Sequence, residues 1–364
     1  MGASRGRGPT IRDVARQAGV SAATVSRVLN DSPLVVEPTR ARVQAAVDEL
    51  GYRMNATART LSLGRSTAVG VLVPFVTTHS AIERLRGVVA QLARHGQRRY
   101  DLLLFDVEAP EQRADAMREL ADRNRIAGLL VVSLPIYDHE IDALQRDDLP
   151  AVLLDVTHPR LPRVVIDNAH GGELAAAHLL GKGHQRIGFV GDHPTNAYGF
   201  TSSEDRRRGF HAELARAGLE LDPRLERFAR HGREEAGACA TELLRLASPP
   251  TAIFAASDDQ AVGVIDAANA VGVEVPGDLS VIGFDDIEIA RYVGLTTVAQ
   301  PLEASGRRAA ELLLAQIEGW AAAAEKLQCE LIVRETTAVR GSGMMRESVR
   351  QREGESAMRG SVYG

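Results

Sequence analysis

The sequence has only two cysteines and no long apolar run, and both absences narrow the possible classes of protein. Cys239 and Cys329 lie far apart and in no metal-ligand spacing, so we expect neither a disulfide framework nor a thiolate metal site. No segment approaches the roughly 18 consecutive apolar residues of a membrane span, and the opening stretch MGASRGRGPT lacks the apolar core of a secretory signal. We therefore expect a cytoplasmic protein with no membrane partner.

The motifs of common enzyme classes are also missing from the sequence. It contains no Walker phosphate loop, no G-x-G-x-x-G dinucleotide fingerprint and no G-x-S-x-G nucleophile elbow. The histidines show no H-x-x-x-H metal spacing, and we interpret His184, in GKGHQRI, as structural rather than catalytic. These absences predict a protein that is not an enzyme and needs no cofactor and no metal.

Lysine is nearly absent, and the positive charge is unevenly distributed. Lys182 and Lys326 are the only lysines among 43 basic residues. Residues 1 to 65 hold ten arginines and five acidic residues (net +5), whereas the remainder holds 33 basic and 43 acidic residues (net −10). Because arginine makes bidentate contacts with phosphate and guanine, we expect a basic head that meets a polyanion and an acidic body.

Three short helices are predicted within the head. Thr10 and Asp13 form an N-terminal capping pattern, and Gly19 ends the apolar periodicity that follows. Ser21 repeats the start signal for a second helix, and a third helix is expected from about residue 39 to residue 50. Short helices joined by tight turns predict a helix-turn-helix unit.

The outward face of the second helix consists of small and hydrogen-bonding residues. Ala22 and Ala23 let the backbone approach base edges and contact thymine methyl groups, and Arg27 can bind a guanine bidentately. Taken alone, SAATVS is more typical of an ordinary capped helix with a neutral face. Its place within a three-helix unit favours a helix that reads the major groove.

After residue 66, short apolar runs alternate with amphipathic stretches of helical length. AVGVLVP, AGLLVVS and LSVIGFD contain no polar alternation, which is typical of parallel strands buried on both faces. Ligands of such sheets bind beyond the carboxyl ends of the strands. The polar residues expected there are Asp106, Ser133, Asp155, Asp192, Ser257, Asp258 and Asp285. An aspartate after a strand often only caps the next helix; we favour that interpretation for Asp106 and Asp192 and leave Asp258 open.

Several stretches of the sequence resemble one known family. The DNA-binding domain of the lactose repressor (LacI/GalR) family is similar to TIRDVARQAGVSAATVSRVLN followed by EPTRARVQAAVDELGY. The effector domain of that family is similar to VVIDNAHGGELAAAHLLGKGHQRIGFVGD, SSEDRRRGF and SDDQAVGVIDAANAVGVEVPGDLSVIGFDD. The resemblance covers residues 10 to about 340, which is nearly the whole chain.

The resemblance implies a fold and a division of the chain. The implied fold class is an all-α helix-turn-helix DNA-binding head plus an α/β effector domain of two doubly wound parallel-sheet lobes, like periplasmic binding proteins. The expected divisions are residues 1–9 as a disordered N-terminus, 10–53 as the DNA-binding domain, 54–65 as a hinge helix and linker, 66–340 as the effector-binding and dimerisation domain, and 341–364 as a disordered tail. The tail has no apolar heptad, so we expect a dimer and not a tetramer.

A short hinge helix follows the head in that family, and YRMNATARTL is similar to it. Leu61 stands at the position of the leucine that inserts into the minor groove. Met54 replaces the usual proline, which leaves the start of the hinge less pre-organised, and Val36 stands where a capping serine is frequent. The residues implied to contact DNA are Thr10, Ser21, Ala22, Ala23, Thr24, Ser26, Arg27, Asn30, Tyr52, Asn55, Ala58, Arg59 and Leu61.

The resemblance also implies an effector site. Arg206 matches the arginine that grips the effector, Asp285 matches its partner carboxylate, and Asp155 matches a third contact. Ser257 stands where many sugar-binding members have asparagine, and Ser133 follows a predicted strand. Phe200, with Tyr198, either stacks on a sugar ring or packs a loop.

We therefore predict a homodimeric, sequence-specific DNA-binding transcription regulator. It is expected to repress from a pseudo-palindromic double-stranded operator and to respond to a small-molecule effector, a sugar. Alternatives within the family are a transcription activator and a sensor of a purine or nucleoside. A sugar-binding protein without a DNA role is a weaker alternative because of the head, and an enzyme would be distinguished by turnover of a ligand.

Overall fold

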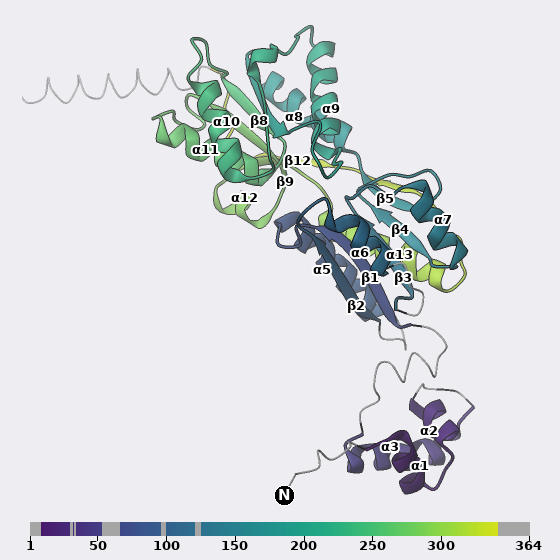
Figure 1. Cartoon of the computed structure of the whole chain (residues 1–364). Helices are drawn as coiled ribbons and strands as arrows, with labels where there is room; N and C mark the ends of the chain where they lie inside the picture. The colour runs from purple at the N-terminus through teal and green to yellow at the C-terminus, as the bar shows by residue number, and fades with distance from the viewer. Residues whose placement is uncertain are drawn as a thin grey trace, which may run out of the picture.

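The computed structural model describes residues 9–29, 32, 34–52, 66–95, 100–120 and 125–340. It contains a three-helix head and two α/β lobes, in agreement with the predicted fold class (Figure 1). The expected disordered termini and the hinge lie outside the described residues, apart from a few positions at their edges. In the part of the chain that the structure describes, no helix is long and apolar enough to cross a membrane.

The head consists of α1 (Ile11–Ala18), α2 (Ala22–Leu29) and α3 (Glu37–Leu50). The hydroxyl and the backbone N–H of Thr10 both donate to the Asp13 carboxylate, at 2.7 and 2.9 Å, which confirms the predicted start of α1. Gly19 ends α1 in the left-handed conformation, with φ +65°. The third helix begins at Glu37, two residues before the predicted start, because the fixed φ of Pro38 suits the first turn of a helix.

Valine and alanine side chains fill the core of the head. Val14, Val25 and Val43 are fully buried, and Val28 and Ala46 are nearly so. They come from all three helices, so that each helix buries one apolar stripe against the other two. The opposite face of α2 is thereby left for another partner.

The first lobe is a six-stranded parallel sheet with helices on both faces. Its strand order is β11-β5-β4-β3-β1-β2, and every strand pair is parallel. Its strands are β1 (Ala68–Pro74), β2 (Asp101–Val107), β3 (Gly128–Val132), β4 (Ala151–Leu154), β5 (Arg163–Ile166) and β11 (Glu325–Leu327). Its helices are α5 (His79–Arg94), α6 (Gln112–Leu120), α7 (Asp138–Arg146) and α13 (Leu302–Ile317).

The second lobe repeats this arrangement with the order β12-β10-β9-β8-β6-β7. Only the edge strand β12 is antiparallel, to β10. Its strands are β6 (Ile187–Asp192), β7 (Glu226–Ala229), β8 (Ala252–Ala255), β9 (Ser280–Asp285), β10 (Thr296–Ala299) and β12 (Glu330–Ile332). Its helices are α8 (Asn168–Gly181), α9 (Ser202–Arg216), the short η1 (Pro223–Leu225), α10 (Arg233–Leu244), α11 (Asp258–Ala270) and α12 (Glu288–Tyr292).

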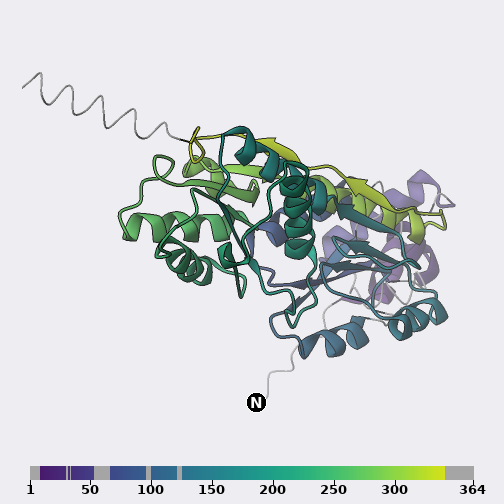
Figure 2. The same ribbon diagram turned by 90° about the horizontal axis from the view of Figure 1, so that it is seen from above.

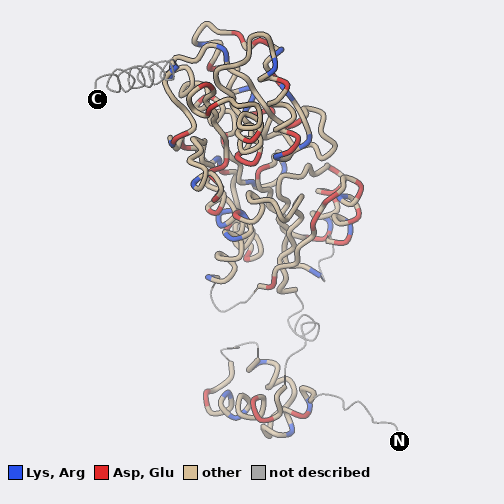
Figure 3. Tube along the Cα trace, turned by 90° about the vertical axis from the view of Figure 1, so that its left-hand side faces the viewer, with Lys and Arg blue, Asp and Glu red and all other residues tan. Residues whose placement is uncertain are grey.

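The chain passes between the lobes three times within the described residues. The crossings lie between β5 and α8, between β10 and α13, and between β11 and β12. Figure 2 shows the yellow segment that carries β11 and β12 running from one lobe to the other. The carboxyl ends of the central strands of both sheets therefore face a common cleft. Figure 3 shows acidic and basic residues interspersed over both lobes.

Candidate ligand cleft and nucleic-acid interface

Residues of both lobes line a cavity of about 770 Å³, a volume that includes its open mouth. The predicted residues Ser133, Asp155, Phe200, Arg206, Ser257 and Asp285 all line it. Six positions from distant parts of the sequence thus meet at one place.

Asp155 and Ser133 form the first-lobe side of the cleft, directly after β4 and β3. Arg84 of α5 donates to the Asp155 carboxylate at 2.7 Å, and the Ser133 hydroxyl donates to the same oxygen at 3.3 Å. Asp155 and Ser133 both adopt positive φ, +60° and +54°, which is uncommon for residues other than glycine. Such backbone positions are concentrated at ligand sites.

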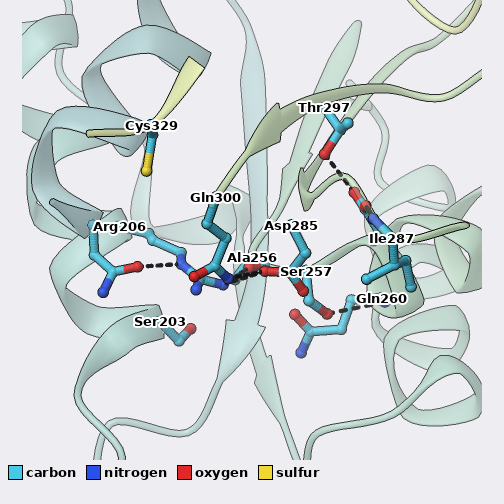
Figure 4. Close-up of polar contacts among 12 residues, drawn as sticks. Ser203, Arg206, Ala256, Ser257, Gln260, Asp285, Ile287, Thr297, Gln300 and Cys329 are labelled. Atoms are coloured by element: carbon cyan, nitrogen blue, oxygen red, sulfur yellow. Dashed lines mark hydrogen bonds and ion pairs between the residues drawn. The ribbon is translucent and has the colours of Figure 1, made fainter. Parts of the chain in front are cut away.

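Arg206 of α9 and Asp285 at the end of β9 form the second-lobe side (Figure 4). Arg206 Nη1 lies 3.6 Å from Asp285 Oδ1, and Nε donates to Asn168 Oδ1 at 2.8 Å. The guanidinium covers the Phe284 ring, with Cζ 3.7 Å from the ring centroid. Burial raises the pKa of Asp285, and the charge of Arg206 and a hydrogen bond from Gln300 oppose that rise.

Gln300, at the crossing between β10 and α13, joins the two halves of the cleft. Its Oε1 accepts from Arg84 Nη2 at 3.2 Å, and its Nε2 donates to Asp285. We did not predict Gln300 or Arg84. Arg84 could have been found as a charged residue on the apolar face of a helix, between Ala81 and Val88, because a charge there needs a buried partner.

Two glycines fix the helices that carry the cleft arginines. A Cβ atom on Gly172 of α8 would lie 2.0 Å from the carbonyl oxygen of Arg206 itself. In the other lobe, a Cβ atom on Gly306 of α13 would lie 1.9 Å from the carbonyl oxygen of Arg84. The helix pairs α8/α9 and α13/α5 therefore pack backbone against backbone at the residues that point into the cleft.

The aromatic residues before α9 pack across the cleft. Tyr198 and Phe200 stack at 5.2 Å, and both rings lie edge-on to Phe75 of the first lobe. The Tyr198 hydroxyl donates to the carbonyl oxygen of Glu108 at 2.6 Å. Tyr198 thus serves loop packing, whereas Phe75 and Phe200 also line the cavity.

The other polar residues at strand ends have separate roles. Ser257 is buried and caps α11 by accepting from Gln260 N at 3.2 Å. Asp106 accepts from Val76 N at 2.9 Å, and Asp258 accepts from Ile287 N and Thr297, so both are structural and neither lines the cavity. The helix-cap interpretation of Asp106 was wrong, because Val76 follows β1 and does not belong to α6, the next helix after β2. The helix-cap interpretation of Asp192 was wrong, because its carboxylate lines the cavity and accepts from Gln260 Nε2 at 2.9 Å.

His184 is buried and its ring nitrogens contact Thr251, Ser280 and the carbonyl oxygen of Ala338 at 3.0 to 3.1 Å. These contacts support its structural interpretation. Both cysteines are free and buried. Among the described residues, no group of His, Cys, Asp or Glu side chains could hold a metal ion.

On the head, α2 presents the predicted groove-reading residues. Ser21 Oγ accepts from Thr24 N at 3.1 Å, and Ala23 and Arg27 are exposed. Ala22 departs from the predicted outward position, since it is half-buried and packs in part against the head core. Thr10 is exposed, and Ser26 and Tyr52 are half-buried. The remaining predicted DNA contacts lie outside the described residues: Asn30, Asn55, Ala58, Arg59 and Leu61.

Comparison with known families and proteins identifies both parts of the chain, the head and the lobes. Residues 10–55 match the bacterial regulatory proteins of the lacI family, and residues 176–337 match a periplasmic binding protein-like domain. The transcriptional repressor PurR of Photobacterium profundum is 35% identical over 85% of this chain and 92% of its own length. The transcriptional regulator GalR of Escherichia coli is 35% identical over 84% of this chain and 88% of its own length.

Solved structures show the same similarity over the head and the lobes. The lac repressor dimer bound to operator and the anti-inducer ONPF superimposes with a TM-score of 0.80 at 28% identity, over 91% of this chain and 100% of that chain. A complex of the transcriptional regulator CelR with cellobiose superimposes with a TM-score of 0.67 at 30% identity, over 90% of this chain and 99% of that chain. The chain therefore belongs to the lacI family of bacterial regulatory proteins and is a DNA-binding transcription regulator with the effector-binding domain of that family.

Proposed function

We propose that the chain represses transcription from a pseudo-palindromic operator as a homodimer, and that a sugar bound between the lobes sets its affinity for DNA. The observation that carries the effector proposal is the meeting of Asp155 and Arg84 from one lobe with Arg206 and Asp285 from the other. Carboxylates and guanidiniums together supply acceptors and donors for vicinal hydroxyl groups.

A buried donor in the cleft supports a hydroxyl-bearing ligand. Arg84 is 5% exposed and lines the cavity, and its Nε has no hydrogen-bond partner among the described residues. A buried donor without a partner costs free energy, so a ligand oxygen that accepts from it gains affinity. The similar regulator CelR binds cellobiose, which is a ligand of this kind.

A purine or nucleoside sensor is a second candidate. Phe75 and Phe200 line the cavity on the same side, and aromatic rings stack on a nucleobase as well as on the apolar face of a sugar. The acidic groups of the opposite side would then bind a ribose. The two candidates differ in which compound releases DNA.

In this proposal, residues 10–53 read each half-site, residues 54–65 form the hinge, and residues 66–340 bind the effector and dimerise. Effector binding rotates one lobe against the other and separates the two hinges, so that Leu61 leaves the minor groove. Ligand binding, with no chemical turnover, accounts for this mechanism. A cytoplasmic location stays a prediction.

Selection of DNA from a random pool by the full-length protein tests the proposal. We expect a pseudo-palindrome, and we expect one compound from a panel of neutral sugars and nucleosides to change its affinity. In vitro transcription from a promoter with the selected operator then separates repression from activation. Recovery of a non-palindromic sequence would contradict the dimeric operator, and indifference to every compound would contradict the effector role.

A further inference from the structure

The charged side chains that line the cleft belong to three basic residues, two arginines and a histidine that is a cation only when protonated, and to three aspartates. Arg84 lies 2.7 Å from Asp155, and Arg206 lies 3.6 Å from Asp285. The third pair, His231 and Asp192, was not expected from the sequence; His231 Nδ1 lies 3.1 Å from Asp192 Oδ1. Each cationic side chain of the cleft therefore has a carboxylate partner of its own.

In the third pair, Asp192 is held by a further hydrogen bond, whereas one ring nitrogen of His231 is open to a ligand. Gln260 Nε2 donates to the same Asp192 oxygen at 2.9 Å, which fixes the carboxylate. With Nδ1–H donated to Asp192, the other ring nitrogen, Nε2, has no partner among the described residues. The His231 side chain is 37% exposed and lines the cavity, so a ligand can reach that nitrogen.

The pairing of charges determines which ligands the cleft favours. A phosphate or carboxylate would face three carboxylates and would have to displace one of them from its cation. A ligand ammonium group would meet the equivalent difficulty with the three cations. A hydroxyl group needs neither exchange, because it can either donate to or accept from His231 Nε2.

We propose that the effector is an uncharged, hydroxyl-bearing molecule and that His231, oriented by Asp192, belongs to the surface that recognises it. This inference rests on the proposed effector site and narrows it to neutral ligands. His231 is a specificity-determining residue in this scheme, since it adds a contact on the second-lobe side beyond Arg206 and Asp285.

The electrostatic surroundings of His231 are consistent with this role. Withdrawal from water lowers its pKa, but the hydrogen bond to Asp192 and the charges of Asp192, Asp285 and Asp259 together raise it above the ordinary value. Asp259 of α11 is itself paired with His79 of α5 at 3.4 Å. Hydroxyl ligands suit both protonation states of His231, whereas an anion would suit only the protonated state.

Inorganic phosphate is the probe for a test that needs no knowledge of the effector. The midpoint of thermal unfolding is measured at pH 6.0 in phosphate and in chloride of equal ionic strength, with the full-length protein. We expect no phosphate-specific rise for the native chain. Asp192→Asn removes the carboxylate that occupies His231, and a bound phosphate then replaces the negative charge that keeps the imidazole protonated, so this variant should gain roughly 3–6 °C at phosphate ten-fold above its dissociation constant.

Two control variants separate the cleft from the rest of the molecule. Asp138→Asn removes an exposed carboxylate at the start of α7, where Asp138 pairs with Arg160 and His158 outside the cleft, and should behave like the native chain. The double variant Asp192→Asn/His231→Ala should lose the gain of the single variant. Any phosphate effect at the basic head is common to all four proteins and cancels in the comparison.

Two results would overturn the inference. A phosphate-specific rise in the native chain that His231→Ala or Arg206→Ala removes would show an available cation in the cleft. Absence of any gain in Asp192→Asn would show that His231 does not face the ligand space. Neither result would affect operator release by an effector, so failure of this inference is distinct from failure of the proposed function.

Discussion

Replacement of Gly172 by alanine is expected to weaken both the fold of the second lobe and the effector response. Gly172 lies where α8 contacts α9, and a Cβ atom there would lie 2.0 Å from the carbonyl oxygen of Arg206. Backbone atoms cannot rotate away as a side chain does, so the two helices must separate by about 1 Å or more. The residue that moves first is the arginine that contacts Asp285.

Two opposing effects set the size of the change. Overpacking of a tight interface costs about 1–3 kcal/mol, and we expect the upper end because the clash is with backbone. Alanine in place of glycine within a helix stabilises by roughly 1 kcal/mol. The expected net loss is therefore about 2 kcal/mol in the free energy of unfolding, or roughly 4–8 °C in the unfolding midpoint.

Gly181→Ala provides a matched control on the same helix. Gly181 is exposed, its φ is negative, and a Cβ atom there would meet nothing within 4 Å. This variant should be slightly more stable than the native chain, by up to about 1 kcal/mol. Urea unfolding of both variants, followed by circular dichroism, measures the difference.

Effector titration of the two variants tests the second half of the reasoning. Gly172→Ala should bind effector more weakly than Gly181→Ala, whereas both should bind operator DNA like the native chain. Equal stability of the two variants would refute the close-packing argument. A destabilised Gly172→Ala with native effector affinity would show that α9 placement does not position Arg206.

Three further predictions concern the head and the cleft. Arg27→Ala should cost about 1–3 kcal/mol in operator affinity and relax the preference at one base pair of each half-site, as measured by repeated selection; uniform loss on all sequences would indicate a phosphate contact instead. Arg206→Ala should leave operator affinity unchanged but weaken effector binding by roughly 2–5 kcal/mol by calorimetry, because Asp285 stays buried without its cation; a native response would exclude the role of Arg206. Asp192→Asn should lower the free energy of unfolding more at pH 6 than at pH 9. Because the pKa of His231 is raised in the folded protein, its pairing with Asp192 stabilises the fold below the unfolded pKa near 6.5, and this stabilisation is lost as the pH rises through the folded pKa. A loss of stability in urea unfolding that does not vary with pH would contradict the pairing.

The local features of the fold could be predicted from the sequence because each depends on neighbouring residues. The Thr10 cap and the Gly19 stop are set within one turn of α1. The apolar runs of the strands indicate burial on both faces, since their side chains show no polar alternation. The resemblance then brought Asp155, Arg206 and Asp285 to one cleft, where the structure also places them.

Long-range contacts could not be predicted in the same way. The hydrogen bonds of Arg84 join residues 71 and 216 positions away, so its role depends on how the chain crosses between the lobes. His231 lies in a loop after β7 that carries no motif, and only its approach to Asp192 gives it a function. Asp192 itself was misinterpreted because a cap and a cleft carboxylate look alike at the end of a strand.

The position of Gln300 connects effector binding to movement of the lobes. It lies in one of the three crossings, where backbone torsions must change if the lobes rotate, and it contacts Arg84 of one lobe and Asp285 of the other. A ligand that competes for either partner therefore favours one arrangement of that crossing over the other. Because such coupling is reciprocal, operator DNA must change effector affinity by the same factor as effector changes operator affinity. Calorimetric titration of effector with and without the selected operator measures that factor, and unequal factors would mean that the two ligands do not act on a common equilibrium.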